Sequence, residues 1–143
     1  MGFDEDLILG EKFELAVVKK IQTKYPKAYK IKGYNKEADI MIPETNKQIE
    51  CKLDLKSRKT GNVAIEYAHR GKSSGIEVTE SEWWALGFYH KDEFLWALVE
   101  IEKLKMMVSL VTKTFGGDGD VSSLYLIPTD EIVYTFRCKK FTK

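Results

Sequence analysis

The first third of the chain predicts a helix followed by a β-hairpin, and this order constrains the fold more than any other feature. Apolar residues recur at a helical period from Leu7 to about Tyr25, and Pro26 ends the pattern. Two strand-like runs follow at 39–42 and 49–53, and the residues between them include the Pro, Thr and Asn that favour turns. We therefore expect this segment to begin an α/β domain.

The remaining elements are predicted from similar patterns. They are a strand at 62–68, a loop at 70–75, a short helix opened by a capping box at 79–82 and continuing through Trp83 and Trp84, a hairpin of residues 85–89 and 94–99, a helix at 102–110, a glycine loop at 115–120, strands at 124–127 and 132–136, and a basic, frayed tail. The simplest architecture that joins these elements is one mixed β-sheet flanked by helices.

The length and the composition favour a single domain that spans residues 1–143. A chain of 143 residues, 43% of them hydrophobic, can bury a substantial core. No apolar run approaches the roughly 20 residues of a membrane span. Cys51 and Cys138 are the only cysteines, and neither belongs to a C-x-x-C pair. The sequence therefore predicts neither a disulfide framework nor a structural zinc site, and we expect a cytoplasmic protein.

Opposite charges gather in two parts of the chain, although the net charge is only +1. Residues 12–72 carry 15 basic and 7 acidic side chains, whereas residues 73–136 carry 4 basic and 11 acidic side chains. This asymmetry favours a face that binds a polyanion. The alternative is that the charges disperse over the folded surface without a common partner, and charge alone does not decide between the two.

The predicted strand at 49–53 carries a glutamate and a lysine two positions apart. Because side chains alternate along a strand, Glu50 and Lys52 face one side, with Cα atoms roughly 6.6 Å apart. If the two runs pair as a hairpin, Asp39 can converge with Glu50 at one end of it. Two converging carboxylates need a cation, and Mg²⁺ takes one or two carboxylates together with water and phosphate oxygens. Such an ion polarises a phosphodiester, and a lysine beside it neutralises developing charge.

Glu14 lies within the apolar stripe of the predicted N-terminal helix, with Gly10 one turn before it. A carboxylate that faces a core is costly unless it is paired or bound to a metal. The missing side chain at Gly10 leaves room close to the helix. Taken alone, Glu14 is better explained as an edge residue that pairs with a lysine. Together with Asp39, Glu50 and Lys52, it becomes a candidate third acid of one site.

This combination resembles the PD-(D/E)XK nuclease superfamily. The residues that carry the likeness are Gly10 and Glu14 on the first helix, then Asp39, then Glu50-Cys51-Lys52. Within the superfamily, the chain is most similar to the small archaeal Holliday-junction resolvases and to related viral and phage nucleases. The likeness covers residues 10–52, about a third of the chain.

The resemblance implies a restriction-endonuclease-like fold, in which a central mixed β-sheet is flanked by helices. It also implies a metal-dependent deoxyribonuclease that uses Mg²⁺, with Mn²⁺ as a substitute. The implied metal ligands are Asp39, Glu50, the Cys51 carbonyl and the helical acid Glu14. Lys52 would lie beside the nucleophilic water, so that Glu14, Asp39, Glu50 and Lys52 form the catalytic set.

The sequence also departs from the family pattern. Ala38 stands where the motif's name has proline, a position that varies in the superfamily, and the spacing from Asp39 to Glu50 is shorter than in many resolvases. Neither departure removes a ligand. Looser similarity to viral relatives runs through residues 74–84 and 116–128.

The resemblance implies DNA as the partner, with a branched junction as the best single substrate. Two cuts in opposing strands need two sites related by symmetry, so we expect a homodimer. Two basic segments are candidates for holding DNA phosphates, and a solvated loop is the alternative for each. Their residues are Lys56, Arg58, Lys59, Arg70, Lys72, Ser73 and Ser74. Glu66 is a weaker candidate for an added metal ligand, with an exposed strand residue as its alternative.

Three other functions stay open. A restriction, homing or repair nuclease is possible on the same scaffold, because a fold and a site do not fix the substrate. A nucleic-acid-binding module would keep the basic segments and tolerate loss of the acids. An interaction protein would use the acidic half of the chain to bind a basic partner.

Overall fold

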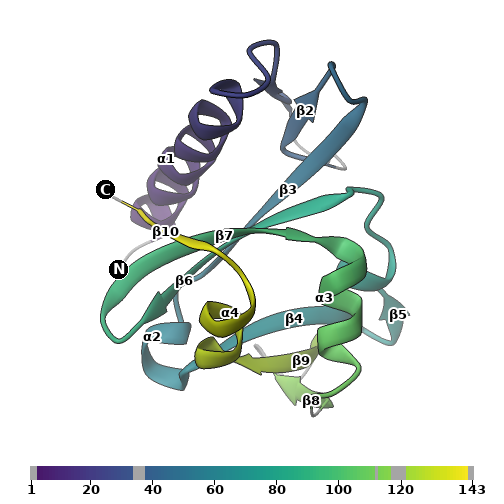
Figure 1. Cartoon of the computed structure of the whole chain (residues 1–143). Helices are drawn as coiled ribbons and strands as arrows, with labels where there is room; N and C mark the ends of the chain where they lie inside the picture. The colour runs from purple at the N-terminus through teal and green to yellow at the C-terminus, as the bar shows by residue number, and fades with distance from the viewer. Residues whose placement is uncertain (1–2, 34–37, 112, 117–121, 142–143) are drawn as a thin grey trace.

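The computed structural model describes residues 3–33, 38–111, 113–116 and 122–141 (Figure 1). In chain order the elements are α1 (Phe3–Gln22), β1 (Tyr29–Lys30), β2 (Ile40–Ile42), β3 (Lys47–Asp54), α2 (Ser57–Thr60), β4 (Asn62–His69), β5 (Lys72–Ser73), the 3₁₀ turn η1 (Gly75–Glu77), β6 (Trp83–His90), β7 (Glu93–Glu100), α3 (Ile101–Val108), β8 (Lys113–Gly116), β9 (Ser122–Pro128), α4 (Thr129–Thr135) and β10 (Cys138–Lys140). None of the helices in these ranges is long and apolar enough to cross a membrane.

The described strands form two sheets. One has six strands in the order β1-β2-β3-β6-β7-β10, and the other has four in the order β5-β4-β9-β8. In the six-stranded sheet, β3 and β6 are parallel and the other neighbours are antiparallel. The predicted α/β class and mixed sheet are therefore confirmed. The prediction of one sheet is wrong, because β4 pairs with β9 and β5 and so belongs to a separate antiparallel sheet.

α1 covers one face of the six-stranded sheet. Its acidic first turn and its basic last turn complement the helix dipole. The apolar stripe of α1, which includes Phe13 and Val17, packs against Ile40 on β2 and Ile49 on β3. These four residues are at most 1% exposed. The helix therefore fixes the strand–turn–strand segment that carries the predicted site.

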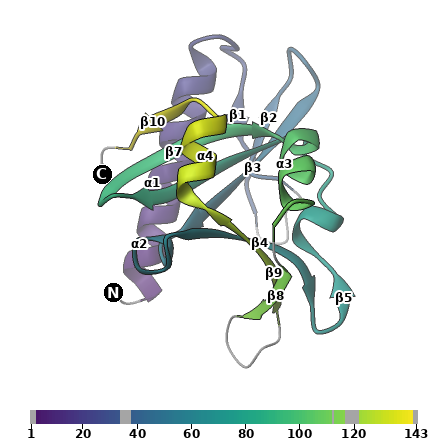
Figure 2. The ribbon, with the colours of Figure 1, turned by 60° about the horizontal axis from the view of Figure 1, so that its bottom comes forward.

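A second core lies on the other face of the same sheet. Trp84 and Leu86 from β6 pack there with Ile65 from β4, Leu104 from α3 and Ile132 from α4. Figure 2 shows α1 behind the six-stranded sheet, and α4 and the second sheet in front of it. Both faces of β6 are consequently covered, which is typical of a central strand, whereas β3 contributes only to the core on the α1 side.

Three predicted elements are corrected by the structure. Trp83 and Trp84 begin strand β6 rather than a short helix, because β6 is the central strand between β3 and β7 and is buried over most of its length. Residues 132–136 were expected as a strand, but Thr129–Thr135 form α4, which starts after Pro128 with acidic residues in its first turn. The tail pairs with β7 as β10 instead of fraying. Most of the predicted glycine loop lies outside the described residues.

Candidate active site

β3 carries the glutamate and the lysine of the predicted site. Ile49 and Cys51 face the α1 side of the sheet, so Glu50 and Lys52 point to the opposite side. Their charged groups form an ion pair, with Lys52 Nζ 2.8 Å from Glu50 Oε2. The Glu50 side chain is 16% exposed and the Lys52 side chain is 47% exposed. The prediction that these two side chains share one face is therefore confirmed.

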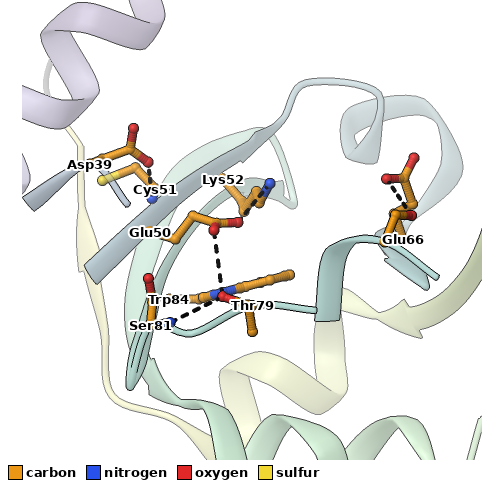
Figure 3. A network of polar contacts seen from close by, with 9 residues as sticks. Asp39, Glu50, Cys51, Lys52, Glu66, Thr79, Ser81 and Trp84 are labelled. Atoms are coloured by element: carbon orange, nitrogen blue, oxygen red, sulfur yellow. Dashed lines mark hydrogen bonds and ion pairs between the residues drawn. The ribbon is translucent and has the colours of Figure 1, made fainter. Parts of the chain in front are cut away.

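The Trp84 ring and the Thr79 hydroxyl lie next to this ion pair (Figure 3). Lys52 Nζ lies 5.3 Å from the ring centre of Trp84, which is within cation–π range. Thr79 Oγ1 donates a long hydrogen bond of 3.5 Å to Glu50 Oε1 and accepts one of 3.1 Å from Trp84 Nε1. The Ser81 amide also donates to Thr79 Oγ1. Thr79 thus links the acid on β3 to the ring on β6.

Asp39 is held by the backbone at the entry to β2. Its amide donates to the Ile49 carbonyl at 3.0 Å, and its own carbonyl accepts from the Ile31 amide at 2.8 Å. The carboxylate Oδ2 accepts a 2.7 Å hydrogen bond from the Cys51 amide. That amide belongs to the peptide between Glu50 and Cys51. In Figure 3 the side chains of Asp39 and Cys51 lie on one side of β3 and that of Glu50 on the other, so the two carboxylates flank the same stretch of backbone.

Glu14 lies apart from the Glu50–Lys52 pair. It is on α1, and its Oε1 forms an ion pair with Lys30 Nζ of β1 at 3.4 Å. The side chain is 20% exposed, at the edge of the buried stripe. A Cβ added at Gly10 would meet nothing within 4 Å, so the expected room beside the helix exists. The contact with Lys30 matches the alternative in which Glu14 pairs with a lysine.

Glu50, Lys52 and Glu66 line one pocket of about 380 Å³. Residues of the segment from Gly75 to Glu80 form the remaining wall of this pocket. Glu66 accepts hydrogen bonds of 2.9 Å from Ser74 Oγ and from Ser122 Oγ, which fix the orientation of its carboxylate. Ser74, one of the predicted DNA-binding residues, is therefore hydrogen-bonded to Glu66 just before this wall begins.

Sequence reasoning missed the two hydroxyl groups that orient the acids of this pocket. Ser122 follows the predicted glycine loop and reaches Glu66 across the antiparallel pairing of β4 and β9. Thr79 was assigned to a capping box, although its hydroxyl contacts Glu50. The contact of Ser122 with Glu66 depends on the long-range pairing of β4 with β9. The contact of Thr79 with Glu50 depends on the position of Glu50 on the central strand β3. Neither contact leaves a local signal in the sequence.

The two basic segments adjoin opposite ends of β4. Lys56 lies just before α2 and, with Lys52, lines a second cavity of about 400 Å³. Arg58 on α2 pairs with Asp92 at 3.1 Å, and its guanidinium lies 5.1 Å from the ring centre of Tyr89. The remaining residues are Lys59 on α2 and Arg70, Lys72 and Ser73 at the β4–β5 turn, and all four are exposed.

The oxygen donors beside β3 are those that the expected Mg²⁺ ion would need as ligands. Within the described residues, no group of three or more His, Cys, Asp or Glu side chains is arranged to hold a metal ion. Mg²⁺, however, needs only one or two carboxylates, since it keeps several waters. The Asp39 and Glu50 carboxylates and the Cys51 carbonyl are hard oxygen donors, and they adjoin the same stretch of β3. By its chemistry, this donor set is one that Mg²⁺ accepts, but the Asp39 and Glu50 side chains lie on opposite sides of β3 (Figure 3), so the predicted convergence of the two carboxylates is not seen.

Comparison with protein-family models, curated proteins and solved structures gives no match for this chain. The function is therefore argued from the geometry and the chemistry of the site.

Proposed function

We propose that this protein is a metal-dependent DNA endonuclease of the PD-(D/E)XK kind, with a restriction-endonuclease-like fold. The observation that carries the proposal is the 2.8 Å Glu50–Lys52 pair at the wall of a pocket, with Asp39 bonded to Cys51, the residue between them. Asp39, Glu50 and Lys52 follow one another along the paired β2–β3 segment. Two acids and a lysine in this order can act together in phosphodiester hydrolysis.

Asp39, Glu50 and the Cys51 carbonyl would hold Mg²⁺, or Mn²⁺ in its place. When bound, the ion supplies polarisation of the scissile phosphate and activation of a water. Lys52 would neutralise negative charge that develops at the phosphate, because its side chain lines the pocket and is half exposed. Glu14 pairs with Lys30 on the α1 side, which is also the side of the Asp39 carboxylate, so it would join this set only by leaving Lys30.

The proposed substrate is DNA, with a branched junction as the first choice. The exposed cations Lys56 and Lys59 at one end of β4, and Arg70 and Lys72 at the other, would contact phosphates on either side of the pocket. A homodimer would supply the second site that paired cuts in opposing strands require.

The test compares two variants of the pair with two variants of a matched control pair. Glu50→Gln and Lys52→Met should each lower Mg²⁺-dependent cleavage at least about a hundredfold while DNA binding survives. Glu93→Gln and Lys140→Met alter an exposed pair on β7 and β10, 3.2 Å apart, and should leave cleavage unchanged. Nicking by Glu50→Gln at the wild-type rate would refute the site.

Substrate class is tested on the wild-type protein. We expect four-way junctions to be cut faster than flaps, linear duplexes or single strands. Equal cleavage of all four would favour a restriction, homing or repair nuclease over a resolvase-like enzyme. Sedimentation as a monomer at the working concentration would contradict the proposed dimer.

A nucleic-acid-binding module without catalysis is the second candidate. It is favoured by the contacts of the acids, since Glu14 and Glu50 each pair with a lysine and Asp39 accepts from a backbone amide. Carboxylates with purely structural roles make the same contacts. Salt-sensitive DNA binding without cleavage in Mg²⁺ or Mn²⁺ would support this candidate.

A further inference from the structure

A third pocket lies on the face of the six-stranded sheet that α1 covers. Its volume is about 340 Å³, within the range of small-molecule sites. Apolar side chains from five elements line it, including Ile21 on α1, Ile42 on β2, Ile49 on β3, Trp83 on β6 and Trp96 on β7. Trp83 is directly opposite Ile49 in the parallel pair of β3 and β6. We call this cavity the α1-side pocket.

Among the residues that the structure describes, four lysines and no acidic residue line the same pocket. They are Lys20 in the last turn of α1, Lys24 just after α1, Lys47 at the start of β3, and Lys139 on β10. Among the described residues, none of the four forms an ion pair with a carboxylate. The α1-side pocket therefore combines an apolar lining with an uncompensated positive charge.

Lys139 is the most constrained of these lysines. Its Nζ lies 4.7 Å from the ring centre of Trp96, inside the pocket lining. Burial, together with the nearby positive charges of Lys20 and Arg137, lowers the pKa of Lys139. An anion placed among these lysines would relieve this repulsion, so the charge here is complementary to a negative ligand.

We propose that the α1-side pocket binds a small amphipathic organic anion, such as a carboxylate with an alkyl body. The alkyl body would lie against Trp83, Trp96 and Ile21, where burial of apolar surface favours binding. The carboxylate would lie among the lysines, where a neutral group would leave their charge uncompensated. The pocket is separated by β3 from Glu50 and Lys52, which point to the other side of the sheet. The proposal is therefore independent of nuclease activity.

The test uses octanoate and its neutral analogue octanamide. Two of the three tryptophans line the pocket, so titration is followed by intrinsic fluorescence. We expect saturable binding of octanoate below its micelle concentration and weaker binding of octanamide. Lys139→Gln should weaken octanoate binding about threefold to fivefold and leave octanamide binding unchanged. Lys103→Gln, an exposed lysine on α3 beyond the other core, should change neither.

Thermal unfolding confirms that the two lysine variants are folded before they are compared. No saturable response to octanoate would overturn the proposal. So would equal affinity for octanoate and octanamide, because the lysines would then make no contribution. A fluorescence change that follows self-association in sedimentation, instead of ligand concentration, would assign the pocket to a protein interface and would likewise overturn it.

Discussion

Replacement of Gly75 by alanine should damage the wall of the candidate active site more than an ordinary glycine substitution does. Gly75 has φ +53°, and an added Cβ would lie 2.1 Å from the Glu66 carbonyl oxygen. Carbon and oxygen in non-bonded contact are normally at least about 3.3 Å apart. The segment would therefore have to move by about 1 Å away from β4.

Gly71 provides the matched control, because it shares one of these two features. Its φ is +79°, but a Cβ there would meet nothing within 4 Å. The left-handed backbone costs an alanine about 1–2 kcal/mol at either position. At Gly75 the overlap with Glu66 adds about 1–3 kcal/mol, the usual cost of overpacking. Gly75→Ala should thus lower the free energy of unfolding by about 2–5 kcal/mol, against about 1–2 kcal/mol for Gly71→Ala.

Urea unfolding followed by circular dichroism measures both free energies. The same displacement should loosen the contacts of Ser74 with Glu66 and of Thr79 with Glu50, because Ser74 directly precedes Gly75 and Thr79 belongs to this wall. Equal destabilisation by the two variants would refute the reasoning, since it would mean that the segment does not press against β4.

Three further predictions concern two buried hydroxyl groups and one half-buried thiol. Ser57→Ala should lower the free energy of unfolding by about 1–3 kcal/mol in urea titrations, because the buried Ser57 hydroxyl donates to the Asp54 carbonyl and accepts from the Tyr89 amide. Ser81→Ala should raise the unfolding temperature, corresponding to a gain of up to about 1 kcal/mol, because this buried hydroxyl has no hydrogen-bond partner within the described part of the chain. Burial raises the pKa of the Cys138 thiol, against the opposing charge of Lys139. The folded state therefore favours the protonated thiol, so stability should fall as the pH rises above the thiol's pKa in the unfolded chain. Iodoacetamide should also modify Cys138, mapped by mass spectrometry, more slowly in the folded protein than in urea.

Elements defined by local pattern could be predicted from the sequence. The hairpin of β6 and β7 was predicted, and its register pairs Tyr89 with Phe94 around a short turn. The pairing of β2 with β3, which brings Ile40 opposite Ile49, was predicted from the two apolar runs and the turn between them. Alternation along β3 was enough to place Glu50 and Lys52 together.

Features that depend on distant partners could not be predicted. Residues 132–136 contain β-branched and aromatic side chains typical of strands, yet they follow Pro128 and pack as a helix against the second core. Trp83 and Trp84 follow a plausible capping box, but two neighbouring strands enclose them on either side. The direction of the Asp39 carboxylate depends on the Cys51 amide, which no spacing rule reveals.

The metal site around β3 is tested most directly by anomalous diffraction from crystals soaked in Mn²⁺. We expect one anomalous peak bounded by the Asp39 and Glu50 carboxylates and the Cys51 carbonyl, and no peak there in Glu50→Gln crystals grown and soaked alike. An empty site in the wild-type protein, or a peak that persists unchanged in Glu50→Gln, would contradict it.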